Sequence, residues 1–375
     1  MEGENEMTYL RTSALRRVRR IARQRGLTLV ELMVALVVGL MVIMAAMSVF
    51  SSSSQSARTV DTAGQLRDDV RFATDIIQRL AVQTGFEDIA FVTRAYFGTP
   101  QTYKGANGHD PREMTPPIQG FHLETVTGGS SDNISTETKT GGKSDVLVLR
   151  YQAVNKGNTA GTEADGSMMV CSGDTLQGTD GAHGLNERTE RAVSIFYVDT
   201  DTDNESNLYC RFSTKGGALS DPIPLVKGVE SFRVLYGVDN ISPGNAVDDN
   251  DNTKHAKLIP NRYVTADQMG VSNDVPGTYT NWRRVRSLRV GMVVRSAENH
   301  GTAKMSETIY PLGEEFSSLA AYPVDDNRLR QKHVFTVNIR NCLNQGYQAA
   351  GDPGKPEADD VPPCDVIVPR DGATS

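Results

Sequence analysis

One apolar segment near the N-terminus limits what this chain can become more than any other feature. Leu27–Phe50 is 24 residues long, and it follows a leader, Met1–Gly26, that holds seven arginines and three glutamates. About 20 helical residues at 1.5 Å each cross the hydrocarbon core of a bilayer, so the segment is long enough to span one. Arginine-rich flanks stay on the cytoplasmic side. The sequence therefore predicts a cytoplasmic leader and export of everything after Phe50.

A single acid, Glu31, lies inside this apolar segment. A lone carboxylate at membrane depth costs roughly 2.5 to 3.5 kcal/mol, so it usually has a cationic partner. No Lys, Arg or His occurs from Gly26 to Ala57, which excludes a partner in the same helix. Cleavage after Gly26 would create an α-amino group at Leu27, and we expect Glu31 to pair with that amine on a neighbouring copy. The alternative is an ordinary signal anchor with Glu31 near the headgroups.

The helical pattern continues beyond the membrane-spanning segment. Apolar residues recur there at steps of three and four, which places them on one face of an α-helix. No proline occurs between Leu27 and Thr99. One helix of about 55 residues, near 80 Å long, is therefore allowed. From Leu66 onward we expect its apolar face to pack on the chain's own domain. The residues of that face are Ala57, Val60, Ala63, Leu66, Val70, Ala73, Ile77 and Leu80.

The rest of the chain contains runs that are typical of β-strands, bounded by Gly, Asp and Ser. We interpret the polar stretches Pro100–Lys143, Gly157–Gly166 and Ser242–Gly277 as surface loops. The predicted fold is α+β: a long N-terminal helix, first transmembrane and then amphipathic, precedes a largely antiparallel sheet domain with long loops. The strand runs are Asp145–Tyr151, Ala192–Val198, Leu208–Phe212, Val229–Tyr236, Val285–Arg295 and Val334–Ile339. The expected segments are the leader 1–26, the helix 27–83 and the exported domain 84–375.

The N-terminal residues closely resemble the signal of the type IV pilin and type II secretion pseudopilin superfamily. A secretory signal peptide is cut after its apolar region, whereas the candidate cleavage junction of this chain precedes the apolar region. Gly26, Leu27 and Glu31 match three roles in that superfamily one by one. The resemblance implies that a prepilin peptidase cuts after Gly26 and N-methylates Leu27. It also implies that Glu31 pairs with the amine of an adjacent subunit during assembly. Ser48 stands where major pilins carry a kinking proline.

Four later segments are similar to the PilW family of minor pilins. They are Gln65–Leu80, Val229–Asp239, Trp282–Val290 and Phe335–Asn341. This resemblance implies a low-abundance subunit that helps to prime pilus assembly and lies at or near the tip. Its expected partners are the prepilin peptidase, other minor pilins, the major pilin, the inner-membrane assembly machinery and a large tip adhesin. Its expected location is the inner membrane, with the domain in the periplasm, and then the extracellular pilus.

Two other functions remain open at this stage. A minor pseudopilin of a type II secretion system would have the same N-terminus and the same priming role. A membrane-anchored periplasmic binding or hydrolytic module would need no cleavage at Gly26. The deletion phenotype separates the minor pilin from the pseudopilin: piliation or twitching is lost in the first case and enzyme secretion in the second.

The four cysteines agree with export. In an oxidising compartment they suggest two disulfides, for which three pairings are open. We favour Cys171 with Cys210, because both flank predicted strands, and Cys342 with Cys364, because that bond would tie down the C-terminal tail. A zinc site is the rival, but the sequence contains no C-x-x-C pair.

One acidic stretch resembles the start of a calcium-binding loop. Asp199, Asp201 and Asp203 have the required oxygen spacing, but Asn204 replaces the glycine of an EF-hand and Cys210 replaces its final glutamate. We interpret the stretch as a solvated turn and keep these three aspartates as weak calcium candidates.

Charge and motifs exclude several other functions. Without its leader the chain holds 32 basic and 43 acidic residues, a net charge of −11, so we expect no general binding to nucleic acid. Gly141–Ser144 imitates part of a phosphate-binding loop, but Glu137 stands where its first glycine belongs. No hydrolase or dinucleotide motif occurs either. We therefore expect no enzymatic activity and no cofactor.

Overall fold

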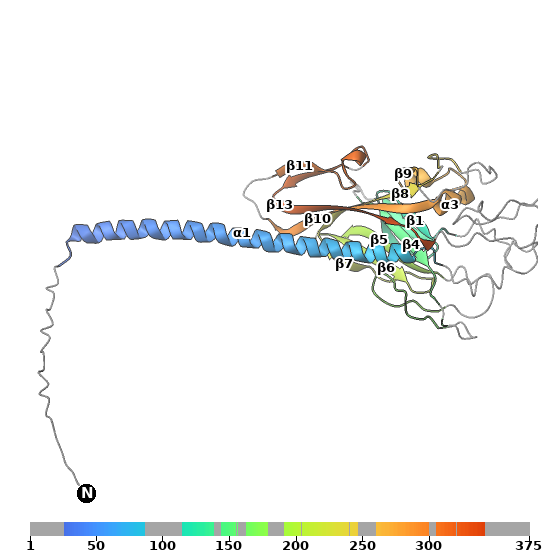
Figure 1. Ribbon diagram of the computed structural model, residues 1–375, viewed down its shortest axis with the longest axis horizontal. Helices are drawn as coiled ribbons and strands as arrows, with labels where there is room; N and C mark the ends of the chain where they lie inside the picture. Colours follow the sequence, from blue (N-terminus) through green and yellow to red (C-terminus); the bar gives the residue numbers. More distant parts are fainter. Residues whose placement is uncertain are drawn as a thin grey trace, which may run out of the picture. The chain divides into compact units, whose positions relative to one another are not determined.

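In the computed structural model the chain divides into two compact units. The units are Met1–Arg58 and Thr59–Ser375. The described residues are 26–86, 115–138, 144–154, 156, 163–178, 191–203, 205–239, 241–246, 260–299, 305–319 and 321–341. Figure 1 shows that one long helix precedes a series of antiparallel strands. This is the α+β architecture that the sequence predicts.

Helix α1, Leu29–Gln83, contains 55 residues and runs through both units (Figure 1). By length and composition it is the one helix among the described residues that could cross a membrane. In the first unit its large apolar side chains are exposed, between 52% and 76% for those from Leu27 to Phe50. This part of α1 therefore has an apolar surface that the described residues of its own unit do not cover.

The part of α1 in the second unit buries one face. Val60 is still 68% exposed, and burial begins at Leu66. Gly85, at a φ of 77°, follows the helix in the left-handed conformation that commonly ends helices. The Asn341 side-chain amide donates a hydrogen bond to the Val82 carbonyl at 2.7 Å, so a distant segment also binds the helix end. The buried side chains are Leu66, Val70, Ala73, Ile77, Leu80 and Ala81.

The first sheet has five antiparallel strands. Successive side chains of a strand point to opposite faces, and accordingly Leu147 and Leu149 belong to one buried cluster whereas Val146 and Val148 belong to another. The strands lie in the spatial order β1 (Ile118–Phe121), β4 (Val146–Tyr151), β5 (Ala192–Thr200), β6 (Ser206–Ser213) and β7 (Ile223–Lys227).

The second sheet has four antiparallel strands, and its two central strands are buried along most of their length. Its spatial order is β13 (Arg328–Asn338), β10 (Val285–Asn299), β8 (Val229–Val238) and β9 (Arg262–Val264). Val290, Met292 and Val294 of β10 face the main core, and on the opposite face Gly291 lies against Pro311. Cover on both faces accounts for the continuous apolar run in the second half of β10.

Two hairpins and three short helices complete the described elements. The hairpins are β2 (Glu124–Gly129) with β3 (Ile134–Thr138) and β11 (Met305–Ile309) with β12 (Tyr322–Asp326). The short helices are η4 (Asp267–Met269), α3 (Val275–Arg283) and η5 (Glu314–Phe316).

One main core joins α1 to both sheets. It includes Ile77 of α1, Phe196 of the first sheet, Phe232 of the second sheet and Trp282 of α3. A smaller cluster, which includes Val126 of β2 and Ile195 of β5, lies on the other face of the first sheet. Both sheets therefore depend on the buried face of α1 for part of their packing.

The structure confirms the predicted strands and corrects two of the predicted loops. Each predicted strand run overlaps β4, β5, β6, β8, β10 or β13. The loop assignments for Pro100–Lys143 and Ser242–Gly277 were wrong in part, because β1 to β3 lie in the first and β9 and η4 lie in the second. These elements have only three to six residues. So short a run carries too few side chains to establish a period.

Candidate functional site

The N-terminal residues singled out by the sequence lie at the first turn of α1. Glu31 and Thr28 cap this turn reciprocally: the Thr28 N–H donates to Glu31 Oε2 at 3.0 Å, and the Glu31 N–H donates to Thr28 Oγ1 at 3.2 Å. This is a capping box, which satisfies two backbone donors at a helix start. The sequence signal, a threonine three residues before a glutamate, was present but did not enter the prediction.

The cap determines where the Glu31 carboxylate lies. It is held at the positive end of the helix dipole, where a negative charge is favoured. Both hydrogen bonds from Thr28, through its N–H and its hydroxyl, go to Glu31 Oε2. An amine created at Leu27 would stand one residue before the capping threonine. The geometry is compatible with the predicted pairing of Glu31 with an amine, which stays a prediction.

Gly26 has no structural reason to be glycine in this fold. It is exposed, and a Cβ built on it would meet no atom within 4 Å. The leader residues before it, 1–25, lie outside the described residues. Cleavage at Gly26 and Leu27, and methylation of Leu27, therefore stay predictions about recognition by another molecule.

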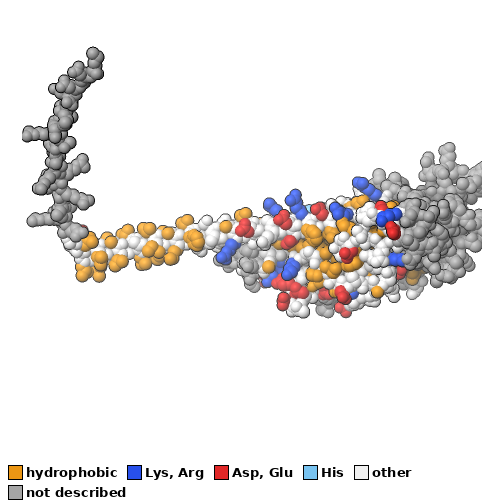
Figure 2. Space-filling view, turned by 90° about the horizontal axis from the view of Figure 1, so that it is seen from below, with side chains coloured by type: hydrophobic (Ala, Val, Ile, Leu, Met, Phe, Trp, Pro, Cys, Tyr) orange, Lys and Arg blue, Asp and Glu red, His pale blue; other side chains and the backbone are white. Residues whose placement is uncertain are grey.

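The surface next to this site is almost uniformly apolar. Figure 2 shows hydrophobic side chains along the visible face of the first part of α1, and charged side chains gather instead over the second unit. Such a surface needs lipid or other apolar helices around it. By its length and apolar composition this helix could cross a membrane.

The structure contains the first of the two disulfides that the sequence favours. Cys171 and Cys210 are bonded, with their Cα atoms 6.2 Å apart, and both side chains are fully buried. The Cys171 N–H also donates to Ser194 Oγ at 3.0 Å. Cys342 and Cys364 lie outside the described residues, so their pairing stays a prediction.

The Cys171–Cys210 bond links β6 to the loop around Cys171, which shares a core cluster with α1. Val170 and Leu176, on either side of Cys171, belong to the same core cluster as Ile77 of α1. Arg79 Nη1 of α1 lies 3.9 Å from the Met169 sulfur. The disulfide therefore supports the surface on which the second part of α1 rests.

Of the three aspartates of the calcium prediction, Asp199 lies in β5, whereas Asp201 and Asp203 lie in the turn between β5 and β6. Asp201 Oδ1 accepts from the N–H groups of Asp203 (3.0 Å) and Glu205 (2.9 Å), and its Oδ2 accepts from Asn207 Nδ2 at 3.0 Å. Hydrogen bonding, first of all from the Glu205 N–H, lowers the Asp201 pKa. Among the described residues no three His, Cys, Asp or Glu side chains gather as metal ligands. The contacts describe an Asx-type turn, and calcium binding stays a prediction.

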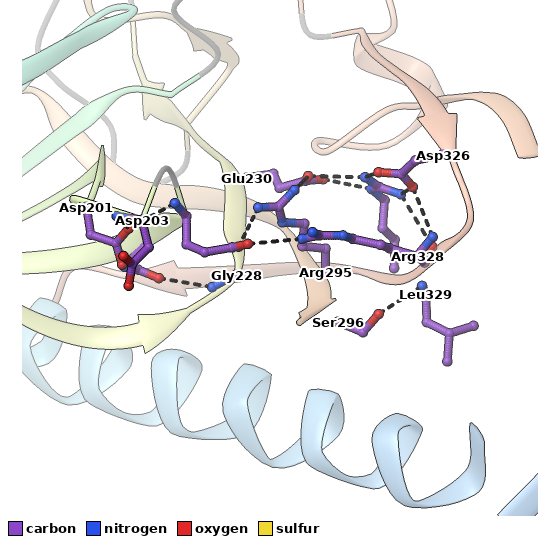
Figure 3. Close-up of polar contacts among 12 residues, drawn as sticks. Asp201, Asp203, Gly228, Glu230, Arg295, Ser296, Asp326, Arg328 and Leu329 are labelled. Atoms are coloured by element: carbon purple, nitrogen blue, oxygen red, sulfur yellow. Dashed lines mark hydrogen bonds and ion pairs between the residues drawn. The ribbon is translucent and has the colours of Figure 1, made fainter. Parts of the chain in front are cut away.

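A network of ion pairs near this turn was not foreseen from the sequence. We call it the Arg295 network (Figure 3). Arg295 pairs with Glu205 and, through Nη1, with Glu230 at 3.2 Å. Arg330 Nε lies 2.7 Å from Glu230 Oε2, and its Nη2 donates to Asp326 at 2.7 Å. Arg328 Nη1 completes the network, 3.2 Å from Glu205 Oε1.

The Arg295 network balances three acids with three arginines and joins distant strands. Hydrogen bonds from Arg330 hold the Asp326 pKa well below its ordinary value. Burial opposes ionisation of Glu205, but hydrogen bonds from Arg295 and Arg328 outweigh it, so the Glu205 pKa is also lowered. Exchanging such a pair for apolar residues is often neutral for stability, whereas removing one partner is costly. The network therefore specifies how the β5–β6 turn meets β10 and β13.

A second polar joint connects the two sheets through the buried Asp145. Asp145 Oδ2 accepts from the Val234 N–H at 2.9 Å and from Arg233 Nε at 3.1 Å, both on β8. Its Oδ1 accepts from the Leu123 N–H at 3.1 Å and lies 3.1 Å from His122 Nδ1. These partners are far apart in the sequence, so periodicity gave no sign of the joint.

Two protein-family models match this chain. The family model described as Type IV Pilus-assembly protein W matches residues 195–341, which run from β5 to just beyond β13. The model described as Prokaryotic N-terminal methylation motif matches residues 21–47, which include Gly26, Leu27 and Glu31. The two matches lie on separate parts of the chain.

Among solved structures, a type IV-like pilin from Thermus thermophilus is similar to this chain. The similarity covers 74% of this chain and 97% of that chain, with 14% sequence identity and a TM-score of 0.34. No match is found among curated proteins.

Proposed function

Because this chain carries a PilW family domain behind a prokaryotic N-terminal methylation motif, we propose that it is a minor type IV pilin that helps to prime pilus assembly and lies at or near the pilus tip. The observation that carries the proposal is the presence of both segments in one chain. The motif falls on the exposed apolar part of α1, and the PilW match spans strands of both sheets.

The first step of the proposed pathway is maturation. The leader stays in the cytoplasm, α1 crosses the inner membrane, and the sheet domain lies in the periplasm. Prepilin peptidase hydrolyses the bond between Gly26 and Leu27, and the new amine is N-methylated. Gly26 supports this step because it is exposed and nothing in the fold requires a glycine there. The Cys171–Cys210 disulfide is in keeping with an oxidising compartment.

The second step is transfer of α1 from lipid into a bundle of neighbouring pilin helices. Lipid tails are as apolar as leucine, so this exchange gains little from the hydrophobic effect, and packing and polar contacts decide the arrangement. A charge pair between Glu31 and a neighbour's amine is satisfied at one axial offset only. Glu31 therefore sets the register in which the subunit enters the filament.

The proposed partners follow from these steps. They are the prepilin peptidase, the other minor pilins, the major pilin and the inner-membrane assembly machinery, with a large tip adhesin as a further partner. Strains that lack this chain provide the test. Loss of surface pili and twitching is the expected result, and restoration by the wild-type chain is the control. Normal piliation with loss of enzyme secretion would assign the chain to a type II secretion system instead.

A further inference from the structure

The two sheets present four edge strands, and β13 differs from the other three in length. Strand β9 has three residues, β1 has four, and β7 has five and contains Pro224. Strand β13 has eleven residues. Proteins commonly protect sheet edges by keeping them short or by placing proline, a bulge or a lysine in them. Three edges of this molecule are short, whereas β13 is long and carries Lys332, whose charge disfavours strands that lack a complementary acid.

The backbone groups on the free side of β13 can be identified from its pairing with β10. The Ile339 N–H donates to the Arg286 carbonyl at 2.9 Å, so this pair is a hydrogen-bonded one. Opposed residues of an antiparallel ladder alternate between bonded and non-bonded pairs. The register runs without a shift from Arg330 to Asn338. The residues whose N–H and C=O groups face away from β10 are therefore Arg330, Lys332, Val334, Thr336 and Asn338.

These outward groups have no strand beside them in the described part of the chain, where β13 pairs with β10 alone. The side chains of Lys332, Thr336 and Asn338 are exposed. No proline or glycine occurs between Arg328 and Asn338. Among the described residues, β13 thus has a continuous row of backbone donors and acceptors that no strand pairs with.

Charge indicates what kind of strand would fit. The chain as a whole has a net charge of −7, but β13 contains three basic residues and no acidic one. Arg328 and Arg330 are engaged by the Arg295 network, whereas Lys332 is exposed. A second copy of β13 would bring another basic strand to the same edge. Complementary charge favours an acidic strand instead.

We propose that the free edge of β13 receives one extended strand of another subunit of the filament, with acidic side chains opposite Lys332. This inference rests on the proposed function, and it names the mode by which one partner binds. Main-chain hydrogen bonds would supply the affinity, and the contact with Lys332 would supply selectivity. The second sheet would gain a fifth strand.

Hydrogen exchange of the full-length processed chain tests this directly. Deuterium uptake at single amides is compared between the chain in detergent and the chain in sheared filaments. In detergent, the Val334 and Thr336 amides should exchange fast, while the Phe335 and Val337 amides, which face β10, exchange slowly. In filaments the first two should become slower by at least about tenfold, as expected for newly bonded amides.

Each other outcome would overturn the inference. If the Val334 and Thr336 amides still exchange fast in filaments that contain the chain, only the strand-addition inference is overturned and the proposed function is not affected. Slow amides already in detergent would mean that residues of the same chain occupy the edge. Absence of the wild-type chain from filaments would overturn the proposed function, and this inference with it.

Variants at one outward position supply an independent test. Thr336→Pro removes an outward N–H without touching the ladder to β10, and proline is tolerated at such edge positions. Thr336→Val, which keeps the N–H, is the matched control. We expect about a tenfold loss of Thr336→Pro from filaments and wild-type amounts of Thr336→Val, with thermal unfolding of both variants close to wild type. Equal incorporation of the two variants would contradict the inference.

Lys332 tests the charge component. Lys332→Glu should lower incorporation severalfold, because like charges face each other at the new strand pair. Lys332→Arg keeps the charge and should behave as wild type. Equal incorporation of Lys332→Glu and Lys332→Arg would exclude an acidic partner strand.

Discussion

The two parts of α1 have the same secondary structure and opposite surroundings. From Leu27 to Phe50 every large apolar side chain is more than half exposed, whereas Leu66, Val70 and Ile77 are at most 5% exposed. The second part is amphipathic, and its apolar face is covered by the chain's own sheets. The first part is apolar on all sides, which no single domain face can cover. The comparison teaches that one continuous helix can pack one segment on its own domain and leave another with an apolar surface on all sides.

Matched isoleucines in the two parts give the largest expected difference. Ile77 is fully buried and Ile43 is 52% exposed. Ile77→Ala should lower the free energy of unfolding by about 2–5 kcal/mol, because it leaves a cavity in the core. Ile43→Ala should change it by less than about 0.5 kcal/mol. Denaturant unfolding of the full chain in detergent, followed by fluorescence of the single Trp282, measures both. Equal losses of unfolding free energy for the two variants would contradict the difference in burial between the two parts of α1.

The Cys171–Cys210 bond tests how strongly the second, buried part of α1 depends on the domain on which it packs. Replacing both cysteines by serine should cost about 2–4 kcal/mol, because the bond closes a loop of intermediate length and holds the surface beneath α1. The same unfolding measurement applies, with a Cys342→Ser, Cys364→Ser variant as the companion. Free thiols at Cys171 and Cys210 in non-reducing peptide maps of the exported protein would contradict the structure.

Glu31 probes the first part. Glu31→Ala should leave cleavage largely intact and lower the amount of the chain in sheared pili by about tenfold, the effect of losing roughly 1.4 kcal/mol of pairing. Glu31→Gln keeps an acceptor for the Thr28 N–H but loses the charge, so it should resemble Glu31→Ala. Thr28→Ala keeps the charge and is the control for the cap. Normal amounts of both Glu31 variants in pili would refute the pairing.

The end of the second part gives the smallest expected effect. The Asn341 side chain donates to the Val82 carbonyl at 2.7 Å, and Asn341→Ala removes that bond. The expected loss is about 0.5–1.5 kcal/mol, the net value of one hydrogen bond. Thermal unfolding of the full chain measures it, and Asn338→Ala on the exposed edge of β13 is the control. A loss no larger than that of the control would mean that the contact does not stabilise the helix end.

The fold could be predicted from the sequence wherever long periodic segments carry the signal. The absence of proline and the steps of three and four in α1 were sufficient to predict its length and buried face. The sequence analysis missed the start of β13, because the charged residues Arg328, Arg330 and Lys332 do not fit the pattern of a half-buried strand. In the structure, acids from other segments of the chain neutralise the two arginines. Charges of this kind are explained by tertiary contacts that no local window contains.

The candidate sites divide in the same way. The N-terminal signal and the Cys171–Cys210 pairing could be proposed from local pattern and compartment. Asp145 could not, because its partners Leu123 and Val234 come from distant segments. The Thr28–Glu31 cap could have been predicted from its local spacing, but the sequence analysis treated Glu31 only as an ion-pair partner.

The central claim is that the chain is cut after Gly26 and that the exposed part of α1 then enters a filament. Mass spectrometry of the N-terminal peptide, from membranes and from sheared surface filaments, tests it most directly. The account predicts a filament peptide that begins at N-methylated Leu27. An intact leader confined to the membrane fraction would contradict it and would make the chain a membrane-anchored module.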